Sequence, residues 1–297
     1  PMHYLITGGT GFIGTALTEA LLREDHAVTV LTRQSRQGRG PLGYVNSLDS
    51  IPATTRFDAV VNLSGASLAG ARWNDAYKRE IVSSRVTTTE QLVAFMRRLD
   101  APPSVLLSGS AIGYYGHHGD EPLTEEGAVV PGFSQDLCQR WEAAAMAASD
   151  LGTRVCLLRF GVVLDRDGGA MLEMAKSFQF GVGSWIGSGK QWLSWVHRRD
   201  VVAAIQFLQQ RDDLSGPFNI TAPEPVTSRG FCTAMQRHKR TVISAPVPAP
   251  IIRLLVGEMA DELLLNGQRV LPAALEAAGF HFSLPTIDAA LDEIFAA

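Results

Sequence analysis

The segment TGGTGFIG at residues 7–14 decides how this sequence is interpreted. It stands between the apolar run HYLIT at 3–7 and the amphipathic run GFIGTALTEALLRED at 11–25. In the spacing G-x-x-G-x-x-G, the first glycine allows a tight turn, the second lets the backbone approach a pyrophosphate, and the third lets a helix pack closely. The amino end of such a helix also attracts phosphate groups. We predict a dinucleotide site, the alternative being a purely structural strand-to-helix turn; the residues of the site are Gly8, Gly9, Thr10, Gly11, Phe12, Ile13 and Gly14.

Short apolar runs continue to alternate with longer amphipathic runs beyond this loop. Strands are expected at 27–33, 57–65, 104–110 and 154–160, with a loop-rich piece at 34–56. Helices are expected at 74–99 and from Ser134 onward, with Ser134 as the N-cap. Such βαβ units form a parallel sheet with right-handed crossovers. The predicted fold class is α/β, a Rossmann-type doubly wound parallel sheet with a smaller C-terminal region.

The second half of the chain has a more interrupted pattern. From about Gly168 it reads GGAMLEMAKSF and then the glycine-rich FGVGSWIGSGKQW. A helix at 201–210 and a strand at 216–221 are expected to return to the main sheet, and a helical tail follows the proline-rich stretch 244–250. We therefore assign residues 1–165 to the nucleotide-binding domain, with 197–222 returning to it. Residues 166–196 and 223–297 form the predicted substrate-binding region.

Composition narrows the classes of partner. The net charge of −4 and the pI near 6.0 give no basic footprint for nucleic acid. The apolar runs are too short to span a bilayer, and no signal peptide is expected because apolar residues begin at Tyr4. The three cysteines are far apart and lack metal-ligand spacing, so we expect no metal site and a reducing, cytoplasmic compartment. The expected partner is a small-molecule substrate, and self-association is left open.

Cofactor choice depends on the end of the second expected strand, where Arg33 stands. An acidic residue at this place accepts hydrogen bonds from a free ribose 2′-hydroxyl. Arg33, with Arg36 and Arg39 behind it, instead suits a 2′-phosphate, because guanidinium binds phosphate through two parallel hydrogen bonds. NADP is therefore favoured over NAD, the alternative being a solvated arginine in a basic loop.

Further motifs bring the chain close to a known family: NLSGAS at 62–67, RW at 72–73, SGSAIGYYG at 108–116, GVVL at 161–164, IGSG at 186–189, WVH at 195–197, GPFN at 216–219 and GQRVLP at 267–272. With GGTGFIG they resemble the extended short-chain dehydrogenases/reductases, in the NAD-dependent epimerase/dehydratase-like branch. The atypical "epimerase family protein" group is the most similar, over essentially the whole chain. This resemblance implies a Rossmann domain, a C-terminal substrate-binding region and a bound NADP(H), with a reaction that is not well defined for the group.

The resemblance also implies roles for residues at three strand ends. It places Asn62, Leu63, Ser64 and Gly65 beside the adenine and the pyrophosphate. Ser108 and Ser110 would hold the nicotinamide ribose and a substrate hydroxyl or carbonyl. Residues of the run Phe160, Gly161 and Val162 would line the nicotinamide. The alternatives are that Asn62 caps a turn and that 160–162 is only a strand edge.

The acid–base chemistry departs from the family pattern. Hydride transfer at a carbon bearing oxygen needs a group that gives or takes the oxygen's proton. In the superfamily a tyrosine does this, assisted by a lysine four residues later, and none of the five tyrosines here has that lysine. Counting back from Glu142, which matches the end of the family motif, the tyrosine position falls on Ser134 and the lysine position on Cys138. Serine is a poor general acid, and a neutral thiol brings no positive charge.

Three interpretations of this departure stay open. In the first, another residue transfers the proton: the candidates are Ser110, Tyr114 and Tyr115, with His117 and His118 nearby. Packing is the alternative for Tyr115, and solvent exposure is expected for both histidines. In the second, water or the substrate supplies the proton. In the third, the protein binds NADPH without turnover, as a redox-sensing or scaffold module.

The remaining candidates carry less weight. Arg85 is the candidate for an anionic substrate, with an exposed helix arginine as the alternative. Asp200 is expected in the first turn of a helix and His197 in a structural role. An aromatic substrate wall is one interpretation of three tryptophans, with core packing as the default: Trp185, Trp192 and Trp195. The leading hypothesis is an NADP(H)-binding oxidoreductase or epimerase-like enzyme for a small polar, sugar-like substrate; the contrary one is a non-catalytic NADPH-binding regulator.

Overall fold

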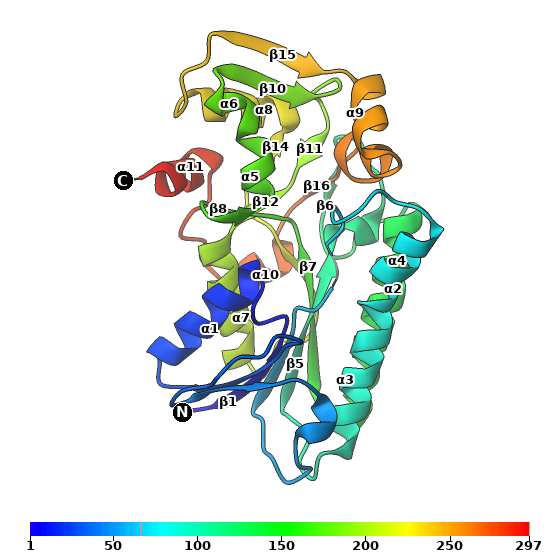
Figure 1. Cartoon of the computed structure of the whole chain (residues 1–297), viewed down its shortest axis with the longest axis vertical. Helices are drawn as coiled ribbons and strands as arrows, with labels where there is room; N and C mark the ends of the chain where they lie inside the picture. Colours follow the sequence, from blue (N-terminus) through cyan, green and yellow to red (C-terminus); the bar gives the residue numbers. More distant parts are fainter. Residues whose placement is uncertain (66, 297) are drawn as a thin grey trace.

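A seven-stranded sheet forms the centre of the computed structural model, which describes residues 1–65 and 67–296 (Figure 1). Its strand order is β13-β7-β5-β4-β1-β2-β3, and every neighbouring pair is parallel. The strands are β1 (His3–Thr7), β2 (Ala27–Leu31), β3 (Leu42–Val45), β4 (Ala59–Asn62), β5 (Val105–Ala111), β7 (Arg154–Phe160) and β13 (Gly216–Ile220). The predicted Rossmann-type α/β fold is confirmed.

Helices cover both faces of the sheet because side chains along each strand alternate between two apolar cores. In β1, Tyr4 and Ile6 belong to one core and Leu5 belongs to the other. The first core includes residues of α1 (Phe12–Arg23) and α7 (Arg198–Gln210), and the second includes residues of α3 (Val86–Arg98) and α4 (Phe133–Met146). Figure 1 shows α1 and α7 on one side of the sheet, with α2 (Asp75–Ser83), α3 and α4 on the other.

The expected helix at 74–99 is wrong as a single element. The chain breaks between α2 and α3, where the hydroxyls of Ser83 and Ser84 donate to the carbonyls of Glu80 and Ile81. Serine side chains compete in this way with the helical backbone pattern. The break places Arg85 at the junction of the two helices.

Two other expected boundaries also differ. The loop-rich piece contains β3, a four-residue edge strand that pairs with β2 and is too short to give a clear alternation. Ser134 is not an N-cap: α4 begins at Phe133, its cap position is Gly132, and Ser134 lies within the first turn. The proline-rich stretch includes β15 (Ile243–Val247), which pairs with β10 (Val182–Ile186).

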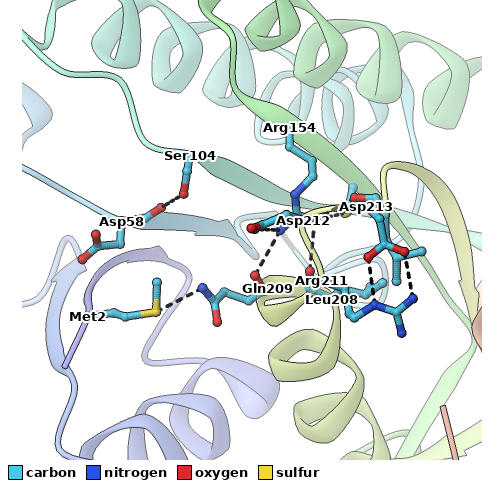
Figure 2. Close-up of polar contacts among 11 residues, drawn as sticks. Met2, Asp58, Ser104, Arg154, Leu208, Gln209, Arg211, Asp212 and Asp213 are labelled. Atoms are coloured by element: carbon cyan, nitrogen blue, oxygen red, sulfur yellow. Dashed lines mark hydrogen bonds and ion pairs between the residues drawn. The ribbon is translucent and has the colours of Figure 1, made fainter. Parts of the chain in front are cut away.

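Arg154, the first residue of β7, attaches the end of α7 to the sheet (Figure 2). Its guanidinium donates to the carbonyl oxygens of Leu208 at 3.0 Å, Gln209 at 3.0 Å and Leu214 at 2.7 Å. The last carbonyls of a helix lack partners within the helix, and a cation there also interacts favourably with the helix dipole. This end of the sheet lies opposite the one that carries the candidate site.

Most of the remaining strands and helices build the other end of the molecule (Figure 1). Short sheets pair β8 (Val162–Asp165) with β9 (Gly168–Gly169) and β12 (Trp195–His197), β11 (Trp192–Leu193) with β14 (Val226–Thr227), and β6 (Pro122–Leu123) with β16 (Arg269–Val270). The helices there are α5 (Ala170–Met174), α6 (Lys176–Gln179), α8 (Ser228–Gln236), α9 (Ala249–Val256), α10 (Ala273–Ala277) and α11 (Ile287–Phe295). Single turns are η1 (Leu48–Ser50), η2 (Ile112–Tyr115), η3 (Ala147–Leu151) and a π-helical turn η4 (Ala260–Leu264). In residues 1–65 and 67–296, no helix is long and apolar enough to cross a membrane.

Candidate functional site

The candidate site lies at the carboxyl ends of the central strands. From β1 the chain runs outward to β2 and β3 on one side, and β4, β5 and β7 follow on the other. The strand order therefore reverses between β1 and β4, and ligands of open α/β sheets bind at such a switch point. The glycine loop begins there, directly after β1 ends at Thr7.

The backbone of this loop requires its first and last glycines. Gly8 has φ +68°, and a Cβ atom on it would lie 2.5 Å from the carbonyl oxygen of Leu63. A Cβ atom on Gly14 would overlap the carbonyl oxygen of Gly8 and lie 2.5 Å from Gly9 Cα. The loop is thus packed against the start of α1, whose first backbone N–H groups have no partner within the helix. Such a cradle fits the pyrophosphate of a dinucleotide.

Asn62 ties together the strands beneath the loop. Its side chain is buried, accepts from Thr7 Oγ1 at 2.6 Å, and donates to Thr89 Oγ1 at 2.9 Å and Ser108 Oγ at 3.1 Å. These bonds join the ends of β1, β4 and β5 to α3. They hold in place the backbone that follows, where Leu63 and Ser64 stand beside Gly8 and Gly65 lies against Arg85. Ser108 is fully buried and serves this same network.

Three arginines lie on the segment that leads from β2 to β3. The Arg39 N–H donates to the Leu42 carbonyl, and Leu42 lies opposite Val28 at the start of β2. Arg33 is exposed just beyond the strand. Arg36 donates from Nε to Gln34 Oε1 at 2.7 Å, and its guanidinium lies 5.9 Å from the centre of the Tyr44 ring. Arg36 and Arg39 are among the residues that line one surface hollow, together with Gln37, Gly38, Leu42 and Tyr44. The structure therefore brings the side chains of Arg36 and Arg39 to one concave surface, which Arg33 does not line.

The opposite end of the site lies between β5 and β7. A Cβ atom on Gly109 of β5 would lie 3.5 Å from Phe160 Cε2. The Gly161 N–H donates to the Ile220 carbonyl, and the Val162 N–H donates to the Ser194 carbonyl. A Cβ atom on Gly161 would lie 2.8 Å from Thr221 Cγ2, so this crossing of strands requires glycine. The run 160–162 is thereby placed beside the end of β5, next to Ser110.

Ser110 is bound to a buried ion pair. Its hydroxyl donates to Glu142 Oε2 at 2.6 Å. Arg159 binds the same carboxylate through Nε at 2.8 Å and Nη2 at 2.9 Å, in a bidentate pair whose side chains are 4% and 8% exposed. The pairing with Glu142 raises the pKa of the Arg159 guanidinium against the opposing effect of burial. Charge-assisted bonds of this kind fix the orientation of the serine hydroxyl.

The two tyrosines of the GYYG loop pack around the same arginine. Tyr115 is fully buried, donates its hydroxyl to Asn219 Oδ1 at 2.7 Å, and accepts from Arg159 Nη1 at 3.0 Å. Burial raises the pKa of Tyr115, against a lowering by Arg159. The Tyr114 ring lies with its centre 3.6 Å from the Arg159 guanidinium carbon. The phenol proton of Tyr115 is directed into the interior, which favours packing as its role, and Tyr114 is only half-buried.

The positions of the superfamily's tyrosine and lysine lie beside Ser110. A Cβ atom on Gly113 would be 3.0 Å from Ser134 Cβ and 3.8 Å from Cys138 Sγ. Burial raises the pKa of the Cys138 thiol to about 12, with Glu142 adding to this rise, so the thiol is neutral near pH 7. A carboxylate from the C-terminal region reaches the same helix end, where Glu262 Oε1 accepts from the Ser134 backbone N–H at 2.9 Å.

Arg85 lies against the loop after β4. A Cβ atom on Gly65 would be 3.0 Å from its guanidinium carbon, which also lies 5.3 Å from the centre of the Trp141 ring. Its Nη1 donates to the Ile81 carbonyl at 3.3 Å. Burial lowers the pKa of Arg85, and attraction to Cys138 and Tyr77 opposes this. Arg85 is half-buried between the loop after β4 and Trp141 rather than fully exposed on a helix.

The expected exposure of the two histidines is wrong. The His118 side chain is 4% exposed, with Nδ1 at 2.5 Å from Glu121 Oε1 and Nε2 at 2.9 Å from the Tyr115 carbonyl. His117 is half-buried and bonds through Nε2 to the Glu262 carbonyl. Folding of the 117–121 loop back onto η2 and η4 explains the difference, since a polar loop sequence carries no signal for such packing.

The other candidates take structural positions. His197 caps α7 by accepting from the Arg199 N–H, and Asp200, in the first turn, also accepts from the N–H groups of Ser283 and Leu284. Trp195 is fully buried, whereas Trp185 and Trp192 are half-buried beneath arginine side chains.

In the described residues, no group of three or more His, Cys, Asp or Glu side chains is placed to hold a metal ion.

Two functional positions escaped the sequence interpretation. The sequence could have indicated Arg159, because a charged residue inside the apolar strand run VCLLRF must have a buried partner. Glu262 gave no local signal, because its contact with Ser134 joins residues 128 positions apart. Long-range contacts of this kind are set by the packing of the C-terminal region on α4.

Fold and site together define a Rossmann-type dinucleotide-binding protein. The family model "NAD dependent epimerase/dehydratase family" matches residues 4–221, and a domain of unknown function, DUF1731, matches 247–294. The chain belongs to the NAD dependent epimerase/dehydratase family, as an extended short-chain dehydrogenase/reductase. It is 42% identical over 288 residues to an Epimerase family protein of Mycobacterium bovis, covering 96% of this chain and 95% of that one.

Solved structures give the same result. Human epimerase family protein SDR39U1 (isoform 2) with NADPH has a TM-score of 0.89 and 32% identity, covering 99% of both chains. A nucleoside-diphosphate sugar epimerase from Corynebacterium glutamicum has a TM-score of 0.81 and 30% identity, covering 99% of this chain and 58% of that one. These matches support a nicotinamide dinucleotide as the cofactor class and an NAD(P)-dependent, epimerase-like function.

Proposed function

We propose that this protein binds NADP(H) and acts as an oxidoreductase or epimerase-like enzyme on a small polar, sugar-like substrate. The observation that carries the proposal is the close-packed glycine loop at the switch point of the sheet. Its cofactor-binding residues are those of the loop together with Arg33, 63–65 and 160–162. Asn62 and Ser108, which are buried and bonded to each other, would hold the backbone after β4 in place rather than contact the cofactor. A bound nicotinamide would supply or accept the hydride.

The preference for NADP(H) rests on the arginines beyond β2. Arg33 and Arg36 follow the carboxyl end of β2, and no acidic residue stands at the position that would hold a free 2′-hydroxyl. The NADPH bound by the human relative is consistent with this choice. The sugar-like substrate rests on the name of the Corynebacterium relative, a nucleoside-diphosphate sugar epimerase. We assign the substrate to the region formed by 166–196 and 223–297, with Arg85 as the candidate partner for an anionic group on it.

An enzymatic function needs a residue that transfers a proton, and the superfamily's tyrosine and lysine are both replaced. Ser134 and Cys138 replace the expected pair, and Tyr115 directs its proton to Asn219. Ser110 is our first candidate to hold a substrate hydroxyl, as an acceptor only, because it donates its own proton to Glu142 and this bond orients its oxygen. Tyr114 is the second, since its ring lies at the same arginine. The same departures favour the alternative function, a non-catalytic NADPH-binding regulatory or redox-sensing protein.

Two measurements on the purified protein test the proposal and separate the alternatives. Calorimetry with NADPH should give saturable binding at one site per chain. Absorbance at the reduced nicotinamide band should then fall when carbonyl compounds are added to the NADPH-loaded protein, or rise when nucleotide sugars are added to the NADP+-loaded protein. Epimerisation leaves this absorbance unchanged overall, so it is followed by chromatographic separation of the nucleotide sugars. Saturable binding without turnover across a broad library would favour the regulator, and absence of binding would contradict both.

Arg33→Asp tests the choice of cofactor. We expect NADPH affinity to fall by about tenfold or more, because a carboxylate replaces a cation beside the 2′-phosphate, and one lost charge-assisted bond amounts to about this factor. NADH affinity should stay level or rise. Calorimetry with both nucleotides on the wild type and the variant gives the answer, with Arg56→Asp as a control on the far end of the sheet. Equal affinity of the wild type for NADH and NADPH would remove the 2′-phosphate argument.

A further inference from the structure

Phe12, the first residue of α1, is held on two sides by segments far away in the sequence. On one side β9 lies against its ring: a Cβ atom on Gly168 would be 2.8 Å from Phe12 Cδ1, and one on Gly169 would be 2.9 Å from Cε2. The antiparallel pairing of β8 with β9 brings these glycines into position. The close approach requires residues without side chains at both places.

Arg198 holds the other side. Its Nη1 donates to the Phe12 carbonyl oxygen at 3.0 Å, and its guanidinium carbon lies 4.3 Å from the centre of the Phe12 ring. Its Nε donates to Asp165 Oδ2 at 3.0 Å, and both side chains are largely buried, at 20% and 17% exposed. A guanidinium with a carboxylate on one edge and a carbonyl on another has its orientation fixed.

We infer that Arg198 is a positioning residue for the pyrophosphate of the dinucleotide. The N–H groups of Phe12 and Ile13 belong to the first turn of α1, which faces the phosphates in such loops. By binding the Phe12 carbonyl and ring, Arg198 fixes the direction of these N–H groups before the cofactor arrives. Its positive charge also lies beside the same helix end. The inference rests on the proposed NADP(H) site and adds a residue that the glycine motif does not contain.

The neighbouring arginine provides a matched control. Arg199 follows Arg198 in α7, is half exposed, and pairs with Glu293 at the surface. The two residues have the same chemistry and nearly the same position in the helix, but only Arg198 contacts the glycine loop. A loss of affinity specific to Arg198 therefore reports the contact with Phe12.

The experiment compares Arg198→Leu, Arg198→Lys and Arg199→Leu by calorimetry with NADPH and with 2′-AMP, which lacks the pyrophosphate. For Arg198→Leu we expect NADPH to bind about tenfold more weakly. Binding of 2′-AMP should be unchanged. Arg198→Lys should restore part of the affinity, since it keeps the charge without the planar fork, and Arg199→Leu should match the wild type.

Each other result overturns the inference. Unchanged NADPH affinity in Arg198→Leu would show that the contact has no part in binding. Equal weakening of NADPH and 2′-AMP binding would show a general structural defect. If Arg198→Leu does not fold, the same comparison of the two affinities is made on Arg198→Lys. A wild type that binds 2′-AMP but not NADPH would overturn the pyrophosphate site itself. Failure of the proposed function is separately visible as a wild type that binds neither ligand.

Discussion

Replacing Arg159 with methionine is expected to lower the free energy of unfolding by about 3–5 kcal/mol. The variant leaves Glu142, whose side chain is 8% exposed, as a buried charge without its bidentate partner. It also removes a donor to Tyr115 and the cation beside the Tyr114 ring. Breaking a buried ion pair costs more than the pair itself contributes, because the remaining charge stays desolvated. Urea unfolding followed by far-UV circular dichroism measures the change.

Two further variants locate the cause. Arg140→Met removes an arginine of α4 that is 54% exposed and lies 3.9 Å from Asp136, so we expect a change within about 0.5 kcal/mol. The double variant Arg159→Met with Glu142→Leu removes both charges and should regain much of the loss. A loss below about 1 kcal/mol for Arg159→Met alone would contradict the buried-pair interpretation.

Gly14→Ala is expected to abolish measurable binding of the dinucleotide, with a loss of at least about a hundredfold, or about 2.7 kcal/mol. The added Cβ atom would overlap the Gly8 carbonyl and lie 2.5 Å from Gly9 Cα. Both obstacles are backbone, so α1 and the loop must separate. The separation moves the N–H groups of the first helical turn away from the phosphates. Calorimetry with NADPH measures the loss, and thermal unfolding records the accompanying fall in stability.

Gly119→Ala is the matched control. Its Cβ atom would meet nothing within 4 Å, and its backbone is not in the left-handed region. We expect NADPH affinity equal to that of the wild type. If Gly14→Ala kept its affinity within a factor of about three, the close packing of the loop would not be what forms the site.

Much of the fold was predictable because its signals are local. The strand runs at 3–7 and 57–65 and the glycine loop between strand and helix need only near neighbours in sequence to be recognised. The incorrect predictions also concerned local sequence patterns, but these patterns were ambiguous. β3 is too short to show a period, and the serines at the break between α2 and α3 interrupt a pattern that otherwise continues. Ser134 looked like a cap, yet α4 begins one residue earlier, and the Ser134 N–H donates to the Glu262 carboxylate.

The candidate site was predictable only in part. The cofactor class is supported by the family and its NADPH-bound member, while preference for NADP(H) remains a prediction. The surroundings of Ser110 could not be predicted, because Glu142 and Arg159 come from α4 and β7 and meet only through tertiary packing. The same holds for Arg198, whose contact with Phe12 spans 186 residues.

The position of β13 at the end of the sheet has a consequence for how the chain assembles. Strand β7 pairs with β13, which the ribosome makes only after residues 161–215, so the last strand of the central sheet joins it late. Until residue 220 emerges, β7 is an open edge with unpaired N–H and C=O groups, a condition that favours aggregation. Residues 161–215 must therefore fold or stay unfolded beside a sheet that still lacks its last strand. A fragment that stops near residue 165 would keep β7 as an unpaired edge permanently.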